Sequence, residues 1–159
     1  MKIEDYALIG DCHSAALVAR DGSIDWLCWP RFDSAACFAA LLGGPEHGRW
    51  QLAPMDPEAR PTRRYRDGTL ILETDLETRD GAVTVLDFMP MRATHCNLLR
   101  IVVGRRGRVP MEMQFVLRFD YGASVPWVTR LPGGDGIRAV AGPDMAVLRS
   151  PVPLQGKDL

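Results

Sequence analysis

The segment MEMQFVLRFD, residues 111–120, decides the fold expected for this 159-residue chain. Apolar side chains stand at every second position from Met111 to Phe119, and mostly polar ones stand between them. A period of two places residues i and i+2 on the same face of a β-strand. We therefore expect a strand with one face in the core and the other largely in water.

Two further places show strand patterns on both sides of an Asp-Gly dipeptide, at Asp21-Gly22 and at Asp80-Gly81. Asp-Gly suits the positive φ angles of a tight turn, so each place predicts an antiparallel hairpin. The flanking segments are SAALVAR (14–20), SIDWLCW (23–29), TLILETDLETR (69–79) and AVTVLDFM (82–89).

The rest of the chain adds short strands, turns and one helix. Shorter strand patterns are NLLRIVVG (97–104), GIRAVA (136–141) and MAVLR (145–149), separated near the C-terminus by the turn clusters PGGDG and GPD. Many strands with Gly/Pro turns are typical of an antiparallel β-sandwich, so the expected fold class is all-β.

One segment of the chain has a helical pattern, and another has no apolar period. SAACFAALLGG (34–44) predicts the helix, because Ser34 can cap it and Gly43-Gly44 can end it. Residues 56–64 contain Pro57 and Pro61 and predict a loop.

Length and composition limit the class of protein. One domain over residues 1–159 is expected, large enough to form its own core. The net charge of -1 gives no electrostatic basis for binding nucleic acid or an anionic membrane. Neither a signal peptide nor a membrane span is expected. Cys12, Cys28, Cys37 and Cys96 form no C-x-x-C pair, so we expect buried, reduced thiols and a cytoplasmic protein.

Four stretches of the chain form a recognisable series. The first is IEDYALIGDCHSAALVARDGSIDWLCWPRFDSAACFAALLGGPEHGRWQLAP (3–54), and the others are RRYRDGTLILET (63–74), VLDFMP (85–90) and RFDYG (118–122). Taken in this order, they resemble the bacterial glycoside hydrolase family 15 proteins of the glucoamylase-like and trehalase-like kind. The resemblance extends from Ile3 to about Trp127. No single stretch is specific, but their order is.

The resemblance implies an N-terminal β-sandwich of the mutarotase-like supersandwich type, which some relatives carry in a longer form. It also implies that catalysis belongs to a following (α/α)6 barrel. There, one glutamic acid protonates the glycosidic oxygen and a second activates water, roughly 6.5–9.5 Å away. This chain has no helical pattern for such a barrel, so no catalytic residue is carried over. We expect a non-catalytic module that packs on the barrel and helps to shape its active-site entrance, with no cofactor.

A loop after the first hairpin holds the best contact candidates, because Pro30 ends the strand and Arg31 and Asp33 flank Phe32. Residues Pro30 to Ser34 are expected to touch the barrel or a sugar; alternatively, the two charges only cap or pair locally. Four tryptophans fit core and interface packing better than the alternative, a sugar-stacking platform: Trp26, Trp29, Trp50 and Trp127. Trp29 and Trp127, each next to a proline at a strand end, are the two expected exceptions. The candidate contact residues are Trp29, Arg31, Phe32, Asp33 and Trp127.

Other chemistry has weaker signals. Cys12-His13 and His95-Cys96 supply zinc-type ligands, but neighbouring residues on a strand point to opposite faces, so we expect no metal site. Asp11, Asp25 and Asp87 lie near apolar strands without a catalytic motif. An independent carbohydrate-binding module and a small stand-alone enzyme remain alternatives.

A sandwich without its barrel keeps an apolar docking surface. We therefore expect the isolated chain to form a homo-oligomer that uses the Trp29–Phe32 turn.

Overall fold

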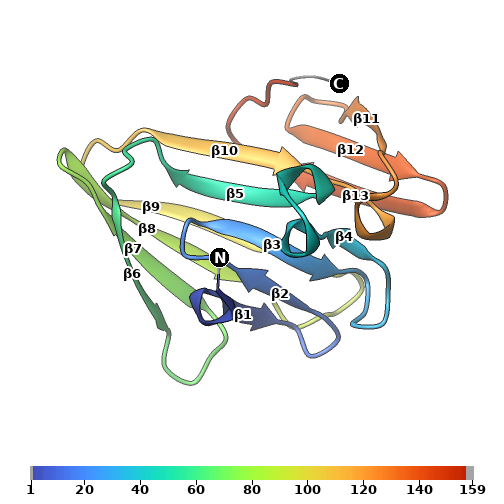
Figure 1. The fold of residues 1–159 in the computed structure, drawn as a ribbon. Helices are drawn as coiled ribbons and strands as arrows, with labels where there is room; N and C mark the ends of the chain where they lie inside the picture. The colour runs from blue at the N-terminus through green and yellow to red at the C-terminus, as the bar shows by residue number, and fades with distance from the viewer. Residues whose placement is uncertain (1, 157–159) are drawn as a thin grey trace.

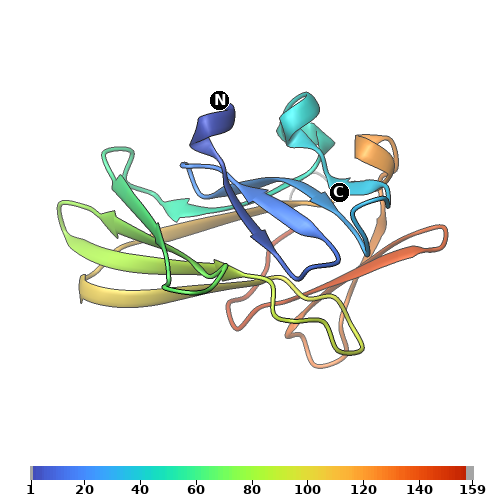
Figure 2. The same cartoon turned by 90° about the horizontal axis from the view of Figure 1, so that it is seen from below.

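The computed structural model describes residues 2–156, and these are folded almost entirely into antiparallel β-sheets. The first sheet has the order β1-β2-β3-β5-β10, with β4 paired to β3. The second has the order β6-β7-β8-β9, and the third β11-β12-β13. Figure 2 shows the first sheet as one layer and the other two sheets as the opposing layer. The predicted all-β sandwich is confirmed.

Thirteen strands follow one another along the described part of the chain (Figure 1). The first sheet contains β1 (Ala7–Gly10), β2 (Ala15–Val18), β3 (Ser23–Cys28), β4 (Ala36–Phe38), β5 (Arg49–Pro54) and β10 (Met111–Val116). The second contains β6 (Arg60–Tyr65), β7 (Leu72–Glu77), β8 (Gly81–Phe88) and β9 (Leu99–Gly107). The third contains β11 (Trp127–Arg130), β12 (Gly136–Ala141) and β13 (Asp144–Arg149).

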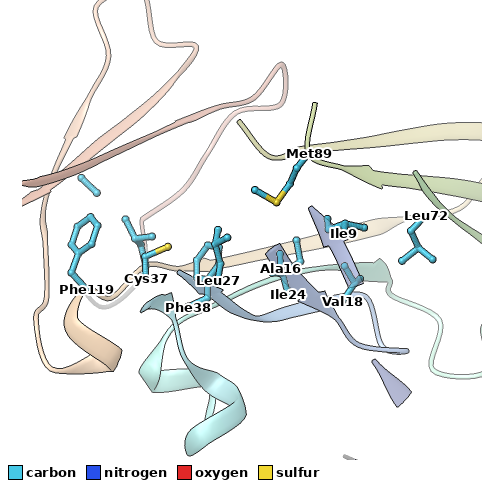
Figure 3. Close-up of a cluster of buried hydrophobic side chains, with 12 residues drawn as sticks. Ile9, Ala16, Val18, Ile24, Leu27, Cys37, Phe38, Leu72, Met89 and Phe119 are labelled. Atoms are coloured by element: carbon cyan, nitrogen blue, oxygen red, sulfur yellow. The ribbon is translucent and has the colours of Figure 1, made fainter. Parts of the chain in front are cut away.

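Buried side chains from all three sheets form the main core between the layers (Figure 3). Ile9 and Ile24 come from the first sheet, Leu72 from the second and Ala139 from the third. A second cluster joins Leu52 of β5 to residues of β7 and β8. These clusters explain the layering, because burial of apolar surface is the main favourable term in sheet packing.

Both predicted hairpins form, since β2 pairs with β3 and β7 with β8 in antiparallel fashion. Gly22 has a φ of 78°, as expected for its turn. Gly81 is needed for a different reason: a Cβ there would lie 2.5 Å from the carbonyl oxygen of Arg106. The Asp80-Gly81 dipeptide therefore marks the hairpin through close approach of β9, not through a positive φ at the glycine.

The alternating segment forms β10 over Met111–Val116, in register with β5. Leu117 and Phe119 continue the pattern beyond the strand and are buried in the main core. Phe115 packs edge-on against the rings of Phe38 and Trp50, with centroids 5.8 Å and 5.6 Å away. The predicted facing of this segment is confirmed.

Truncating Phe115 tests that facing. Phe115→Ala is expected to lower the free energy of unfolding by about 3 kcal/mol, the lower end for phenylalanine truncation, because the ring is only partly buried. Urea denaturation followed by circular dichroism measures the loss. A denaturation midpoint unmoved by this substitution would contradict the packing of β10 on β4 and β5.

The predicted helix over residues 34–44 is wrong. Ala36–Phe38 form β4, and only Ala40–Leu42 make a single 3-10 turn. All three residues of β4 are buried, with Phe38 in the main core and Ala36 in a separate cluster with Cys28. Burial on both faces favours a strand paired to β3, and this packing overrides the helix propensity of alanine. The hydroxyl oxygen of Ser34 accepts a hydrogen bond from the Arg31 amide instead of capping a helix.

The predicted loop over residues 56–64 is also partly wrong, because β6 begins at Arg60 and pairs with β7. This strand is at a sheet edge and alternates between partly buried and exposed residues, so it lacks an apolar period. Pro61 is tolerated because an edge strand leaves one side of its backbone unpaired. No helix within residues 2–156 is long and apolar enough to cross a membrane.

A buried ion pair connects the two layers. Asp87 of β8 and Arg100 of β9 are cross-strand neighbours, with Nε 2.8 Å from Oδ1 and both side chains about 1% exposed. The same guanidinium donates to the carbonyl oxygens of Trp50, at 2.6 Å, and Gly22, at 2.8 Å. Arg100 thus ties the second sheet to the backbone of the first.

Candidate functional site

An open depression at one end of the first sheet is lined by Cys12, His13, Arg31, Phe32 and Asp33. It lies between the loop joining β1 to β2 and the segment that follows β3. Three of the five predicted contact residues therefore come together, and the Cys12-His13 pair lies beside them. The sequence contained no signal for that proximity, because the two loops are about 20 residues apart.

The β1–β2 loop has a fixed shape. Oδ1 of Asp11 accepts hydrogen bonds from the amides of His13, at 3.0 Å, and Ser14, at 2.8 Å. The Ser14 hydroxyl donates to the carbonyl oxygen of Cys28 at the end of β3. Cys12 adopts a left-handed conformation with a φ of 68°. An aspartate that caps two amides is a common way to close such a turn.

Arg92 completes this arrangement from a third loop. Its Nε lies 2.9 Å, and its Nη2 2.8 Å, from Oδ2 of Asp11, whose side chain is fully buried. Burial on its own raises the pKa of Asp11, but the two amides and the guanidinium outweigh it and hold the pKa below its ordinary value. Asp11 therefore stays charged and holds the β1–β2 loop to the loop of Arg92. The sequence did not reveal this partner, since 81 residues separate the two.

The second wall of the depression is also preformed. The Phe32 amide donates to the carbonyl oxygen of His13 at 3.0 Å, and the Ser34 amide donates to that of Arg31 at 3.1 Å. Arg31 and Asp33 make a bidentate pair, at 2.9 Å and 3.1 Å. Hydrogen bonding, and secondarily charge, lowers the pKa of Asp33 and raises that of Arg31. The pair leaves Phe32 between its members with 62% of its surface exposed.

The two predicted tryptophans are in different surroundings. Trp29 packs against the main core, and its buried indole nitrogen has no hydrogen-bond partner among residues 2–156. Trp127 begins β11 of the third sheet, is 78% exposed, and is not among the residues lining the depression. Trp26 and Trp50 are partly buried against core clusters. Of the five candidate contact residues, Trp29 and Trp127 therefore do not line the depression.

The three carboxylates near apolar strands each have separate partners. Asp11 binds Arg92, and Asp87 binds Arg100. Asp25 accepts hydrogen bonds from the hydroxyls of Tyr6, at 2.7 Å, and Ser23. Burial, and then the hydrogen bond to Asp25, raises the pKa of Tyr6. Each carboxylate thus has a structural role in the fold.

The cysteines and histidines are dispersed. Over residues 2–156 no group of three or more His, Cys, Asp and Glu side chains is placed to hold a metal ion. All four thiols are free, with Cys28 and Cys37 buried as predicted. Cys12 is exposed and Cys96 only partly buried, so the expectation of burial was wrong for Cys12. Cys12 lies in the loop capped by Asp11 and is one of the residues lining the depression.

Comparison with known proteins supports the family resemblance that the order of motifs predicts. Residues 1–153 match the family described as "Trehalase-like, N-terminal". The trehalase of Mycolicibacterium smegmatis is 35% identical over 115 residues, which cover 72% of this chain and 17% of that protein. The trehalase of Mycobacterium tuberculosis is 34% identical over 115 residues, with the same coverage.

A more distant relative covers slightly more of the chain. The trehalase of Thermoplasma volcanium is 28% identical over 136 residues, or 81% of this chain and 22% of that protein. The chain thus spans about a fifth of the length of these relatives. No solved structure shows a significant match.

Proposed function

The chain belongs to the trehalase-like N-terminal family, and from that premise we propose that it is the non-catalytic β-sandwich module of a longer glycoside hydrolase. The parent enzyme would be an inverting α-glucosidase of family 15, of the trehalase or glucoamylase type. Residues 1–159 would form its first domain, a mutarotase-like sandwich. The catalytic (α/α)6 barrel would follow in the same parent chain, and the protein would be cytoplasmic.

The observation that carries this proposal is the coverage of the relatives. Matches to trehalases include 72% of this chain but only 17% of each mycobacterial enzyme. Inverting hydrolysis needs two carboxyl groups far enough apart to hold a water molecule. In the described residues the buried aspartates at 11 and 87 are instead paired with arginines. A supporting module accounts for both facts without requiring catalysis by this chain.

We propose that the module contacts its barrel through residues 30–34. Phe32 is an exposed aromatic ring on a loop whose backbone is already fixed by hydrogen bonds to His13 and within residues 31–34. An aromatic anchor on a rigid loop loses little conformational entropy when it is buried in a partner. The adjacent Arg31–Asp33 pair can remain at the rim of such a contact, where charge pairs are solvated.

The second candidate function is an independent carbohydrate-binding module. It is favoured by the arrangement of Arg31 and Asp33 around Phe32, because sugars bind aromatic faces flanked by planar hydrogen-bonding groups. Trp127 offers a second exposed aromatic surface on another sheet. Titration of the chain with trehalose and maltose, followed by NMR, separates the candidates: a saturable shift at residues 30–34 favours the binding module.

The principal prediction is that the isolated chain hydrolyses no glycoside. Purified protein is incubated with trehalose, maltose and p-nitrophenyl α-glucoside, and released glucose or nitrophenol is measured. We expect no turnover above buffer, because the buried aspartates at 11 and 87 are engaged in ion pairs with arginines within the described residues. Turnover that survives repurification and disappears in a point variant of this chain contradicts the proposal.

The gene provides an independent test. We expect the reading frame to continue past Leu159 for several hundred codons with helical periodicity. A stop codon at that point would favour the independent binding module instead. A continuing frame without helical periodicity would count against the barrel.

A further inference from the structure

Three short 3-10 turns lie together on the face of the first sheet that points away from the core (Figure 2). They are η2 (Ala40–Leu42), η3 (Pro45–His47) and η4 (Asp120–Gly122), and η3 contacts both of the others. Together with Trp26 they form what we call the turn cluster. Part of the family resemblance depends on RFDYG (118–122), which contains η4, yet the contact proposed for residues 30–34 gives this turn no role.

His47 holds the turn cluster in one shape. Its Nδ1 accepts a hydrogen bond from the Gly44 amide at 3.2 Å. Gly122 of η4 lies directly against the imidazole ring, because a Cβ at that position would be 2.8 Å from Cδ2 of His47. The Ala40 amide donates to the Gly48 carbonyl at 3.1 Å, which closes the segment that carries η2 and η3. The cluster is therefore a rigid support for the side chains at its surface.

η4 places a tyrosine in a backbone conformation that this residue rarely adopts. Asp120, Tyr121 and Gly122 have successive φ angles of 52°, 57° and 103°. Glycine adopts such angles freely and aspartate tolerates them, but they are unfavourable for tyrosine. Two hydrogen bonds between the backbones of Phe119 and Ser124, at 2.9 Å and 3.0 Å, close the turn around it. Unfavourable conformations that the surrounding structure fixes in this way are concentrated at functional sites.

The turn cluster presents apolar side chains at its surface. The ring of Tyr121 lies 6.1 Å from that of Trp26, at an interplanar angle of 40°, and Tyr121 is 45% exposed. Trp26 in turn packs on the small buried cluster that includes Ala36 of β4. Leu42 of η2 is 66% exposed. An aromatic pair and a leucine on a rigid support are typical of an interaction surface.

This surface is continuous with the contact proposed for residues 30–34. β4 begins two residues after Ser34, and η4 packs on β4. The Arg118 amide, which directly precedes the η4 turn region, donates to the Cys37 carbonyl of β4 at 3.3 Å. Phe32 and Tyr121 are therefore exposed aromatic residues on either side of the same short strand. A partner that covers one of them can extend over the other.

We propose that the turn cluster is a docking surface for the polypeptide that follows this module in the parent chain, with Tyr121 and Leu42 as its apolar anchors. The inference rests on the proposed function and extends its contact beyond residues 30–34. The matched regions are only 17% of each mycobacterial trehalase, so most of such a chain lies outside the module and can supply the partner surface. Because the anchors are apolar and already fixed in place, that surface is expected to be an apolar recess.

Photocrosslinking in the full-length parent protein tests this contact. The probe is p-benzoylphenylalanine in place of Tyr121, and mass spectrometry identifies the peptide to which it becomes attached after irradiation. We expect attachment to a peptide beyond residue 159 of the same chain. Leu42→Asp puts a charge into the contact and should abolish this crosslink. Because Leu42 is 66% exposed, circular dichroism should show that the Leu42→Asp protein is folded.

Leu8 is the matched control position, because it is 46% exposed on β1, at the edge of the same sheet. The probe at Leu8 should give no crosslink beyond residue 159. The inference fails if Tyr121 links to a second copy of the chain, if Tyr121 and Leu8 give equal yields, or if Leu42→Asp leaves the yield unchanged.

A probe at Phe32 separates this inference from the proposed function. A crosslink from Phe32 to a peptide beyond residue 159, with none from Tyr121, overturns the inference and leaves the contact at residues 30–34 standing. Crosslinks from neither position, or a reading frame that stops at Leu159, overturn both. Crosslinks from both positions are the expected result.

Discussion

Replacing Asp87 by alanine is expected to lower the free energy of unfolding by about 3–5 kcal/mol, the usual effect of removing one member of a buried ion pair. The guanidinium of Arg100 would be left in a site where its side chain is about 1% exposed. Burying a charge without its counterion is unfavourable, because the lost hydration is not replaced by an ion pair. Domains of this size are stable by roughly 5–15 kcal/mol, so the loss would be a large share of the total.

The consequences should extend across both layers. Arg100 donates to the carbonyl oxygens of Trp50 and Gly22 in the first sheet, and its guanidinium lies 5.5 Å from the Trp50 ring centroid. Asp87 holds the guanidinium through Nε and Nη2. Without that carboxylate, we expect the Arg100 side chain to reorient toward water and to lose its hydrogen bonds to both carbonyl groups. We therefore expect the contact between the layers near β5 to loosen first.

Equilibrium urea denaturation measures the effect, and Asp135→Ala is the control. Asp135 pairs with Arg149 on the surface, with side chains 54% and 68% exposed, so its loss should cost only about 0–1 kcal/mol. Replacing both members, as Asp87→Leu with Arg100→Met, should recover part of the stability because no charge is left buried. An Asp87→Ala midpoint equal to that of Asp135→Ala would show that the pair does not support the fold.

The strands that could be predicted from sequence are those with a strong local signal. The period of two around Phe115, and the Asp-Gly turn at Gly22, both depend on residues close together in the chain. β4 was missed because alanine propensity and Ser34 favoured a helix, while the deciding factor was burial against β3. β6 was missed because an exposed edge strand has no apolar period.

The candidate site was predictable only in part, for the same physical reason. Arg31, Phe32 and Asp33 stood out because charges, an aromatic ring and a preceding proline are adjacent in sequence. The partners that fix the loops are distant: Arg92 reaches Asp11 across 81 residues, and Phe32 bonds the backbone of His13. The sequence shows that Asp11 and Asp87 lie near apolar strands. It does not show which arginine pairs with each of them.

Replacing Asp11 is expected to destabilise the sandwich in a pH-dependent way. The two oxygens of Asp11 have separate roles, since Oδ1 caps the amides of His13 and Ser14 and Oδ2 binds Arg92. Asp11→Asn can keep the amide caps and loses only the ion pair, whereas Asp11→Ala loses both. We expect a loss of about 3 kcal/mol for alanine at pH 7 and a smaller loss for asparagine.

The pH dependence follows from the lowered pKa of Asp11 in the folded protein. Because the unfolded chain binds this proton more readily, the charged carboxylate stabilises the fold at pH values above its unfolded pKa of about 3.9. That stabilisation declines as the pH falls below this value and is lost once the folded carboxyl is protonated. Asparagine does not titrate, so the difference in unfolding free energy between wild type and Asp11→Asn should be constant near neutrality and shrink in acid.

Urea denaturation of both proteins between neutral and strongly acidic pH measures this difference directly. Other carboxyls with lowered pKa values, such as Glu73 and Asp75, titrate in both proteins and cancel in the comparison. A difference that stays constant down to the lowest pH would mean that the fold does not favour the charged form of Asp11. A difference that shrinks in acid would show that the charged carboxylate, held by the amides of Ser14 and His13 and by Arg92, stabilises the folded protein.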